Sequence, residues 1–332
     1  DLADPLTLIL AAFLVLPIAT IAMVSFWDYD SIQIFSAFVF TNYEETITSP
    51  VTWNTYINTF KYTLIVWALT LLIGFWVAYY LAFHIRSTTM QMVLFLVCTI
   101  PFLTSNIIRM ISWIPFLGRN GLLNQTLMSM GIINQPLEFL LFSDFAVVLA
   151  MVHLYTLFMV TPIFNTLMRI DRALIEAARD AGANGWQILT NVIIPLAKPG
   201  IAIGSIFVVT LVMGDFITVR FMSGGQSASV GLMMANQIAL LQYPAAAANA
   251  MILLIIVLLI GFPAGYLVIS ANQSRDSGKD KEEKYSATGL TEGWPSKIQR
   301  RLYQVPIPHP SNKVAYYETN NWRTSRLYVQ FQ

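Results

Sequence analysis

The stretch Met251-Ile252-Leu253-Leu254-Ile255-Ile256-Val257-Leu258-Leu259-Ile260 decides the class of fold that this chain adopts. It carries no charge, and mostly apolar residues continue on both sides of it, over residues 246–270. A bilayer core about 30 Å thick needs about 20 mainly apolar residues in helical form. We therefore expect this stretch to cross a membrane.

Five other segments of the chain have the same character. The 332 residues are 56% hydrophobic and 11% charged, whereas a soluble domain carries about 25% charged residues. The sequence therefore predicts an all-α integral membrane protein with six transmembrane helices, over residues 6–26, 62–83, 92–108, 145–168, 200–219 and 246–270.

The lysines and arginines predict which side of the membrane each connection faces, because cytoplasmic loops carry an excess of them. One set of connections contains nine basic residues and the opposite set contains four, so the first set is expected in the cytosol. The first set is Arg86, Arg169, Arg172, Arg179, Lys198, Arg275, Lys279, Lys281 and Lys284, and the second is Lys61, Arg109, Arg119 and Arg220.

Two of the outer connections are long and are expected to contain structure of their own. Residues 27–61 have turn and strand-like pieces, and residues 113–144 contain a predicted short helix, Leu122–Met130, closed by Gly131. The polar connection 222–245 is expected to be flexible or re-entrant.

The two ends of the chain differ from the apolar body. Residues 1–271 are predicted to form the membrane domain, and residues 272–332 a polar tail, either a cytosolic extension or sequence added to the natural chain. Three prolines between residues 306 and 310 argue against regular structure in the tail. The chain starts with Asp1, so we expect an N-terminal piece to precede it, without a recognisable cleavable signal peptide.

A short polar island separates the fourth and fifth predicted spans. It contains Glu176-Ala177-Ala178-Arg179-Asp180-Ala181-Gly182, and Val192-Ile193-Ile194-Pro195 follows it. Leu174, Ala177, Ala178 and Ala181 would share one small apolar face of a helix, which Gly182 is suited to end. A second short helix is expected at Trp186–Ile194, at an angle to the first. From spacing alone, an ordinary amphipathic cytosolic loop explains the island equally well.

This island resembles the cytoplasmic signature loop of permease subunits of bacterial binding-protein-dependent ABC importers. The resemblance runs from about Leu6 to Ala271, although Val192 and Ile194 depart mildly from the family pattern. Within that superfamily the chain most resembles permeases of the spermidine/putrescine type. The residues that carry this likeness are Pro101–Arg109, Gly121–Asn124, Leu174–Ala183 and Met222–Gly225.

The resemblance implies a multi-pass protein of the bacterial inner membrane that is driven by separate subunits. The island would be a coupling helix that docks on a cytosolic ATPase subunit dimer, with Glu176, Ala177, Ala178, Gly182 and Pro195 at the contact. A second homologous permease and an extracytoplasmic substrate-binding protein would complete the importer. The chain has no phosphate-binding loop, so ATP and magnesium are expected in the ATPase, with no cofactor in this chain.

Ionisable residues at membrane depth are the candidates for a solute path, because such groups are costly there. Asp215 in the fifth span could attract a cationic solute, with aromatic rings in support. A structural ion pair with Arg109 or Arg220 is an equally good explanation. Asn106 is the fourth candidate, and Arg220 weighs against a polycation unless it is paired.

The sequence disfavours several other functions. A net charge of +1 gives no basic footprint for nucleic acid, and the single cysteine and three histidines make a metal site improbable. Opines, amines, thiamine or phosphonates remain alternative solutes. A membrane enzyme that uses Asp215, His153 and Arg109 lacks a paired nucleophile and base, and a passive channel is the third alternative.

Overall fold

The computed structural model describes residues 5–30, 33–85, 87–263, 265, 313–319 and 325–331. The chain forms two units, Asp1–Phe164 with Ile201–Gly265, and Asn165–Gly200 with Tyr266–Gln332. The first unit contains α1 (Pro5–Val24), β1 (Asp28–Tyr29), β2 (Ile34–Phe35), α2 (Thr41–Thr48), α3 (Pro50–Tyr79), a π-helical turn (Tyr80–His84), α4 (Thr88–Thr99), a 3₁₀ turn (Ile100–Leu103), α5 (Asn106–Leu117), α6 (Leu122–Ser129), a 3₁₀ turn (Glu138–Leu140), most of α7 (Asp144–Leu167), most of α10 (Ile194–Gly214), α11 (Ile217–Met222), α12 (Val230–Ala239) and a final helix, Tyr243–Pro263.

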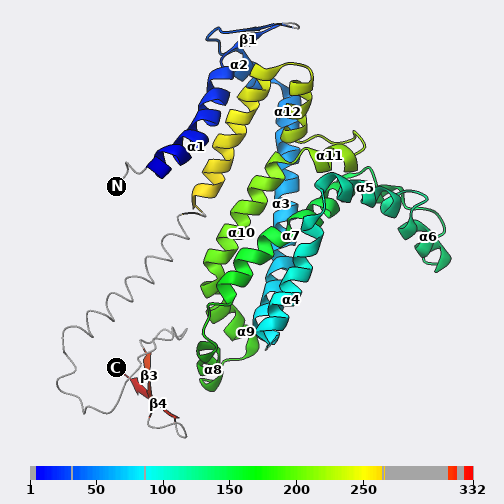
Figure 1. Ribbon diagram of the computed structural model, residues 1–332. Coiled ribbons are helices and arrows are strands. Elements are labelled where there is room, and N and C mark those ends of the chain that lie inside the picture. The colour runs from blue at the N-terminus through cyan, green and yellow to red at the C-terminus, as the bar shows by residue number, and fades with distance from the viewer. Residues whose placement is uncertain are drawn as a thin grey trace. The chain divides into compact units, whose positions relative to one another are not determined.

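Helix α3 is the centre of the first unit (Figure 1). Its buried side is rich in threonines, and the hydroxyls of Thr55, Thr59 and Thr63 donate to the carbonyls four residues earlier. Because these polar groups are satisfied within the helix, neighbouring elements can approach closely. The backbone N–H of Val230 in α12 donates to the Thr59 hydroxyl at 2.9 Å, and the Trp67 indole donates to Ser205 of α10 at 2.9 Å.

Four helices in the described residues are long and apolar enough to cross a membrane, and a fifth is added if one bent pair is counted as one span. This confirms a multi-pass helical protein. In α1, which coincides with the first predicted span, the described apolar part Ala11–Val24 is shorter than a bilayer core requires. The four long helices are Pro50–His84, Asp144–Leu167, Gly185–Gly214 and Tyr243–Pro263.

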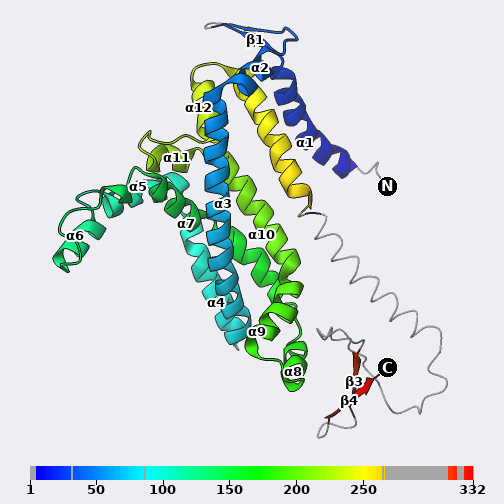
Figure 2. The same ribbon diagram turned by 180° about the vertical axis from the view of Figure 1, so that it is seen from behind.

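The third predicted span, 92–108, is wrong at its outer end. The helical segment Thr88–Leu103 stops, and the chain bends by 87° into Asn106–Ser129. Pro101 cannot donate a backbone hydrogen bond, Thr104 is extended, and the Thr104 hydroxyl donates to the Pro101 carbonyl at 2.8 Å. Figure 2 shows α5 and α6 extending sideways from the long helices.

The expectation of a separate second helix at Trp186–Ile194 is wrong. Helix α9 (Gly185–Ile188) continues through a π-helical turn (Leu189–Ile193) into α10. Gly185–Gly214 is one helix that is apolar enough overall to cross a membrane, although Gln187, Thr190 and Asn191 lie in its first turns. Pro195 and Pro199 lie where this helix continues. The fifth helix therefore begins well before residue 200, and it ends at Gly214 rather than at Val219.

The remaining segments lie outside the long helices. Strands β1 and β2 pair antiparallel, with Asp28 opposite Phe35, and α6 confirms the short helix expected at Leu122–Met130. The expectation of no regular structure in the tail is wrong for two stretches, because β3 (Lys313–Thr319) and β4 (Ser325–Phe331) pair antiparallel. The prolines at residues 306–310 lie outside the described residues.

Candidate functional site

Helix α8 (Arg172–Asp180) forms the first part of the polar island. Its first turn is capped by Asp171, whose carboxylate accepts from the Ala173 N–H at 2.9 Å. At its end, the N–H of Gly182 donates to the Arg179 carbonyl and the N–H of Ala183 to the Ala178 carbonyl. Gly182 has a φ of +86°, which a glycine adopts at little cost. These bonds make a complete Schellman cap, so Gly182 ends the helix as the sequence predicts.

The exposed side of this region differs from the small apolar face expected from the sequence. Glu176, Gly182 and Pro195 are exposed, whereas Ala178 is buried and Ala177 is partly buried. Trp186, the second residue of α9, is 68% exposed. Sequence reasoning missed Trp186 as a possible contact, although a large aromatic residue in a polar loop is a usable signal.

A mutual capping box fixes the start of α9. The Gln187 N–H donates to the Asn184 side chain, and the Asn184 N–H donates to the Gln187 side chain, both at 2.9 Å. This reciprocal arrangement satisfies two backbone donors at the helix start. The turn between α8 and α9 is therefore defined by its Schellman cap on one side and its capping box on the other.

Asp215 lies directly after α10 and is 7% exposed. Its carboxylate accepts from the Tyr155 hydroxyl of α7 at 2.7 Å and from the Thr218 N–H of α11 at 3.0 Å. Among the described residues, no lysine or arginine lies within ion-pair distance of it. The structural ion pair with Arg109 or Arg220 that the sequence left open is therefore absent from the described part of the chain.

The two arginines of the predicted path have different surroundings. The Arg109 guanidinium lies 5.8 Å from the centre of the Phe102 ring. Arg220 is exposed in the last turn of α11. The structure thus places Asp215 against Tyr155 and Arg109 near Phe102, whereas the Arg220 side chain is exposed.

Polar atoms without partners lie in this region. Asn106 Oδ1, Arg109 Nε and Thr218 Oγ1 are buried and make no hydrogen bond within the described residues. Such atoms are uncommon in folded proteins, because each costs free energy unless it is paired. Together with the Asp215 carboxylate, which has no basic partner among the described residues, they make this region the polar candidate for contact with a solute.

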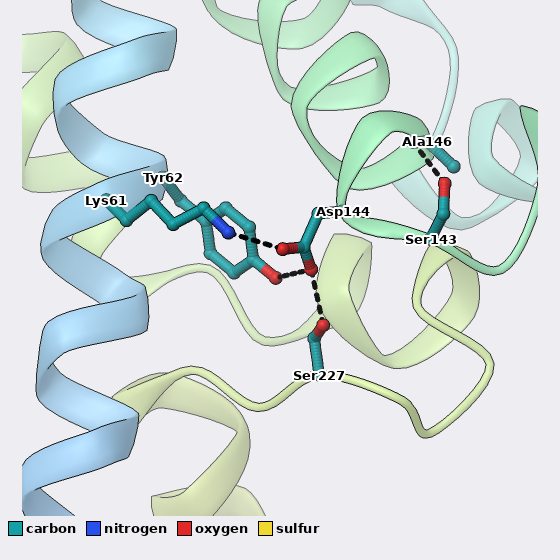
Figure 3. A network of polar contacts seen from close by, with 6 residues as sticks. All are labelled: Lys61, Tyr62, Ser143, Asp144, Ala146 and Ser227. Carbon is teal, nitrogen blue, oxygen red and sulfur yellow. Dashed lines mark hydrogen bonds and ion pairs between the residues drawn. The ribbon is translucent and has the colours of Figure 1, made fainter. Parts of the chain in front are cut away.

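A second polar cluster was not predicted. Asp144, the first residue of α7, accepts from Lys61 Nζ on one carboxylate oxygen and from the Tyr62 and Ser227 hydroxyls on the other, each at 2.5 Å (Figure 3). The sequence placed Lys61 and Asp144 on the outer side, but their separation of 83 residues gave no sign that they meet.

An apolar cavity of about 310 Å³ lies between α3, α10 and the final helix. Its lining contains no ionisable side chain, so it does not offer a charged solute any counter-charge. The residues around it are Phe60, Thr63, Leu64, Trp67, Ser205, Ile206, Val209, Thr210, Val257, Ile260 and Gly261.

Comparisons with known proteins place these features in a family. Residues 71–271 match the model of the family described as binding-protein-dependent transport system inner membrane component. The spermidine/putrescine transport system permease protein PotB of Haemophilus influenzae is 35% identical over 194 residues, covering 55% of this chain and 67% of that protein. PotB of Escherichia coli K12 is 32% identical over 224 residues, covering 67% of this chain and 80% of that protein.

More distant similarities exist in sequence and in structure. The putative 2-aminoethylphosphonate transport system permease protein PhnU of Salmonella typhimurium LT2 is 32% identical over 144 residues, 43% of this chain and 50% of that protein. A chain of a bacterial ABC transporter involved in the import of alginate superposes with a TM-score of 0.60 at 16% identity, covering 80% of this chain and 93% of that chain. The latter similarity supports the fold alone.

Proposed function

The chain belongs to the family of binding-protein-dependent transport system inner membrane components, and from this premise we propose that it carries polyamines such as spermidine and putrescine into the cytosol. It is a multi-pass permease subunit of a bacterial ABC importer, a transport subunit rather than an enzyme. The observation that carries the substrate proposal is the 32% identity to PotB of Escherichia coli over 67% of this chain.

Asp215 supports a cationic solute. A buried carboxylate without a basic partner is costly, and it attracts a positive charge that enters its surroundings. The Tyr155 hydroxyl holds the carboxylate in place. We propose that one ammonium group of the polyamine passes close to Asp215, with Asn106 and Arg109 bordering the path and Arg220 outside it.

The driving force is proposed to come from a dimer of ATPase subunits that bind ATP and magnesium. The α8–α9 turn would be the coupling helix, with Glu176, Gly182, Pro195 and the exposed Trp186 facing the ATPase, and Ala177 and Ala178 supporting them. Its well-defined caps suit an element that transmits force. A second permease subunit and an extracytoplasmic binding protein would complete the assembly, with six spans in this chain.

The proposal is tested by transport into proteoliposomes that contain this chain, the second permease and the ATPase. With binding protein outside and ATP inside, labelled spermidine should accumulate, and a non-hydrolysable ATP analogue should abolish accumulation. Unlabelled putrescine should compete, and 2-aminoethylphosphonate should not. Uptake of 2-aminoethylphosphonate without uptake of either polyamine would overturn the substrate assignment.

A further inference from the structure

The two oxygens of the Asp144 carboxylate have different hydrogen-bond partners. One oxygen, Oδ1, accepts from the hydroxyls of Tyr62 and Ser227, and the other, Oδ2, accepts from Lys61 Nζ. Tyr62 is buried, whereas the side chains of Lys61 and Asp144 are 49% and 42% exposed. The two hydroxyls therefore hold one oxygen of the carboxylate, and the other oxygen faces Lys61 (Figure 3) in a pair whose side chains are both partly exposed.

Helix geometry puts this cluster at the outer edge of the membrane. Lys61 lies 23 residues before His84, which is at the inner end of the same helical segment. Asp144 likewise lies 23 residues before Leu167, which is at the end of α7. Each separation corresponds to a rise of about 35 Å, slightly more than the hydrocarbon core of a bilayer. A solute from the extracytoplasmic side would therefore reach Asp144 before it entered the membrane.

The same helix leads from this cluster to Asp215. Tyr155, which holds Asp215, follows Asp144 by 11 residues in α7, so the two side chains lie on nearly the same face of the helix. The rise between them is about 16 Å. Asp144 and Asp215 are thus an outer and an inner carboxylate along one side of α7.

Lys61 is chemically similar to the end of a polyamine, because its side chain is a primary ammonium on a four-carbon stem. Its nitrogen lies 5.9 Å from the centre of the Tyr62 ring as well as against Asp144. A carboxylate next to an aromatic ring is a suitable environment for an alkylammonium group.

We propose that Asp144 and Tyr62 form an outer receiving site for the primary ammonium of the transported amine, and that Lys61 occupies this site until the amine displaces it. Displacement requires little free energy, because an exposed ion pair contributes little to stability. The carboxylate keeps its hydrogen bonds to Tyr62 and Ser227 when Lys61 leaves. The proposal rests on the proposed function, because it requires a cationic amine as the solute.

The test uses the assembled importer in nanodiscs, without binding protein and without ATP, and measures equilibrium binding of labelled spermidine. Lys61→Gln removes the internal competitor and should tighten binding by roughly threefold, the size of an exposed ion pair. Asp144→Asn removes the receiving charge and should weaken binding by about tenfold or more. The opposite signs are the signature of competition, because a purely structural pair would lose function in both variants.

Arg119→Gln is the matched control, since it removes one positive charge from the exposed pair Arg119–Glu138 on the same side of the protein. It should bind spermidine as the wild type does. Asp144→Glu keeps the charge and should retain more binding than Asp144→Asn, which separates loss of charge from loss of folding. n-Butylamine should compete with spermidine for binding to the wild type. In Lys61→Gln, a lower concentration of n-butylamine should be enough to displace spermidine.

Three results would overturn the proposal: effects of equal sign in Lys61→Gln and Asp144→Asn, no effect of Lys61→Gln, or no spermidine binding to either the wild type or Lys61→Gln. Failure of the proposed function is distinguishable from these results. If the wild-type importer shows ATP-dependent uptake of spermidine but the opposite signs are missing, only the receiving site is refuted. If it takes up no polyamine at all, the substrate assignment fails as well.

Discussion

Asp215 is the residue on which the proposed solute path depends most. Its hydrogen bonds from Tyr155 and from the Thr218 N–H orient the carboxylate but do not neutralise it. A positive charge on the solute would therefore find an oriented counter-charge that the protein has already desolvated. This arrangement favours a cation near Asp215.

Replacing Asp215 with asparagine should impair transport without preventing assembly. Asparagine can still accept from the Thr218 N–H, but it carries no charge. We expect initial spermidine uptake in proteoliposomes to fall by about tenfold or more, equivalent to about 1.4 kcal/mol of lost interaction. Glu138→Gln is the control, because Glu138 is an exposed carboxylate paired with Arg119. Wild-type uptake in Asp215→Asn would remove Asp215 from the path.

Sequence reasoning found Asp215 and Arg109 because ionisable groups stand out in an apolar chain, but it could not find their partners. Tyr155 lies 60 residues before Asp215, and a tyrosine in an apolar helix attracts no attention by composition. The Lys61–Asp144 pair was missed because its two members lie 83 residues apart in the sequence. Single residues with unusual chemistry are visible in a sequence, whereas contacts between distant helices depend on packing that a sequence pattern does not specify.

At the scale of elements, the apolar runs predicted where helices exist but not where they bend. The fourth span was predicted at residues 145–168 and is Asp144–Leu167. The third was extended past Thr104, because apolar composition continues through Ile107 and Ile108 although the backbone turns after Leu103. Hydrophobicity indicates burial or lipid contact. It does not indicate where local hydrogen bonds stabilise a break in a helix.

Close packing of α7 against α10 depends on Gly204. A Cβ at this position would lie 2.8 Å from Met159 Sδ and 3.2 Å from Pro162 Cγ, so Gly204→Ala should force the two helices apart. The expected loss of stability is about 1–2 kcal/mol, seen as a lower melting temperature of the purified complex. Gly261→Ala is the matched control, because nothing lies within 4 Å of its added Cβ. An equal effect of both substitutions would contradict this assignment.

Gly182 in the α8–α9 turn differs from Gly204, because it has open space around it but a left-handed backbone. Alanine there would strain the Schellman cap by about 1–2 kcal/mol. We expect Gly182→Ala to lower the number of spermidine molecules transported per ATP hydrolysed. Gly185→Ala, also with open space but without a positive φ, should keep the wild-type ratio. Unchanged coupling in Gly182→Ala would argue against this turn as the contact with the ATPase.

At the scale of the whole molecule, hydrophobicity and charge combine into a topology that neither indicates alone. The described residues contain four long apolar helices and one bent pair, and a sixth crossing by α1 is part of the proposal. The connections rich in lysine and arginine lie between alternate helices, which predicts that the polar island lies on the cytosolic side. On the opposite side, α3 begins at Pro50, so about 16 Å of helix precedes Lys61.

This topology can be measured with single cysteines, because Cys98 is the only cysteine in the sequence. In a Cys98→Ala background, Gln226→Cys and Asn54→Cys should react with a membrane-impermeant maleimide in spheroplasts. Ala181→Cys should react only after the membrane is permeabilised, because it lies in the α8–α9 turn. All three positions are exposed in the structure, so a difference in labelling reports the side of the membrane rather than burial.

A fluorescent protein fused ahead of α1 tests the sixth crossing separately. If α1 spans the membrane, the fusion lies in the cytosol and fluoresces, because residues 27–61 are outside. If α1 instead rests on the outer surface, the fusion is exported and remains dark, while the three cysteines label as before. Labelling of Ala181→Cys in intact spheroplasts would be the more serious result. It would place the polar island outside the cell, where no ATPase could drive it.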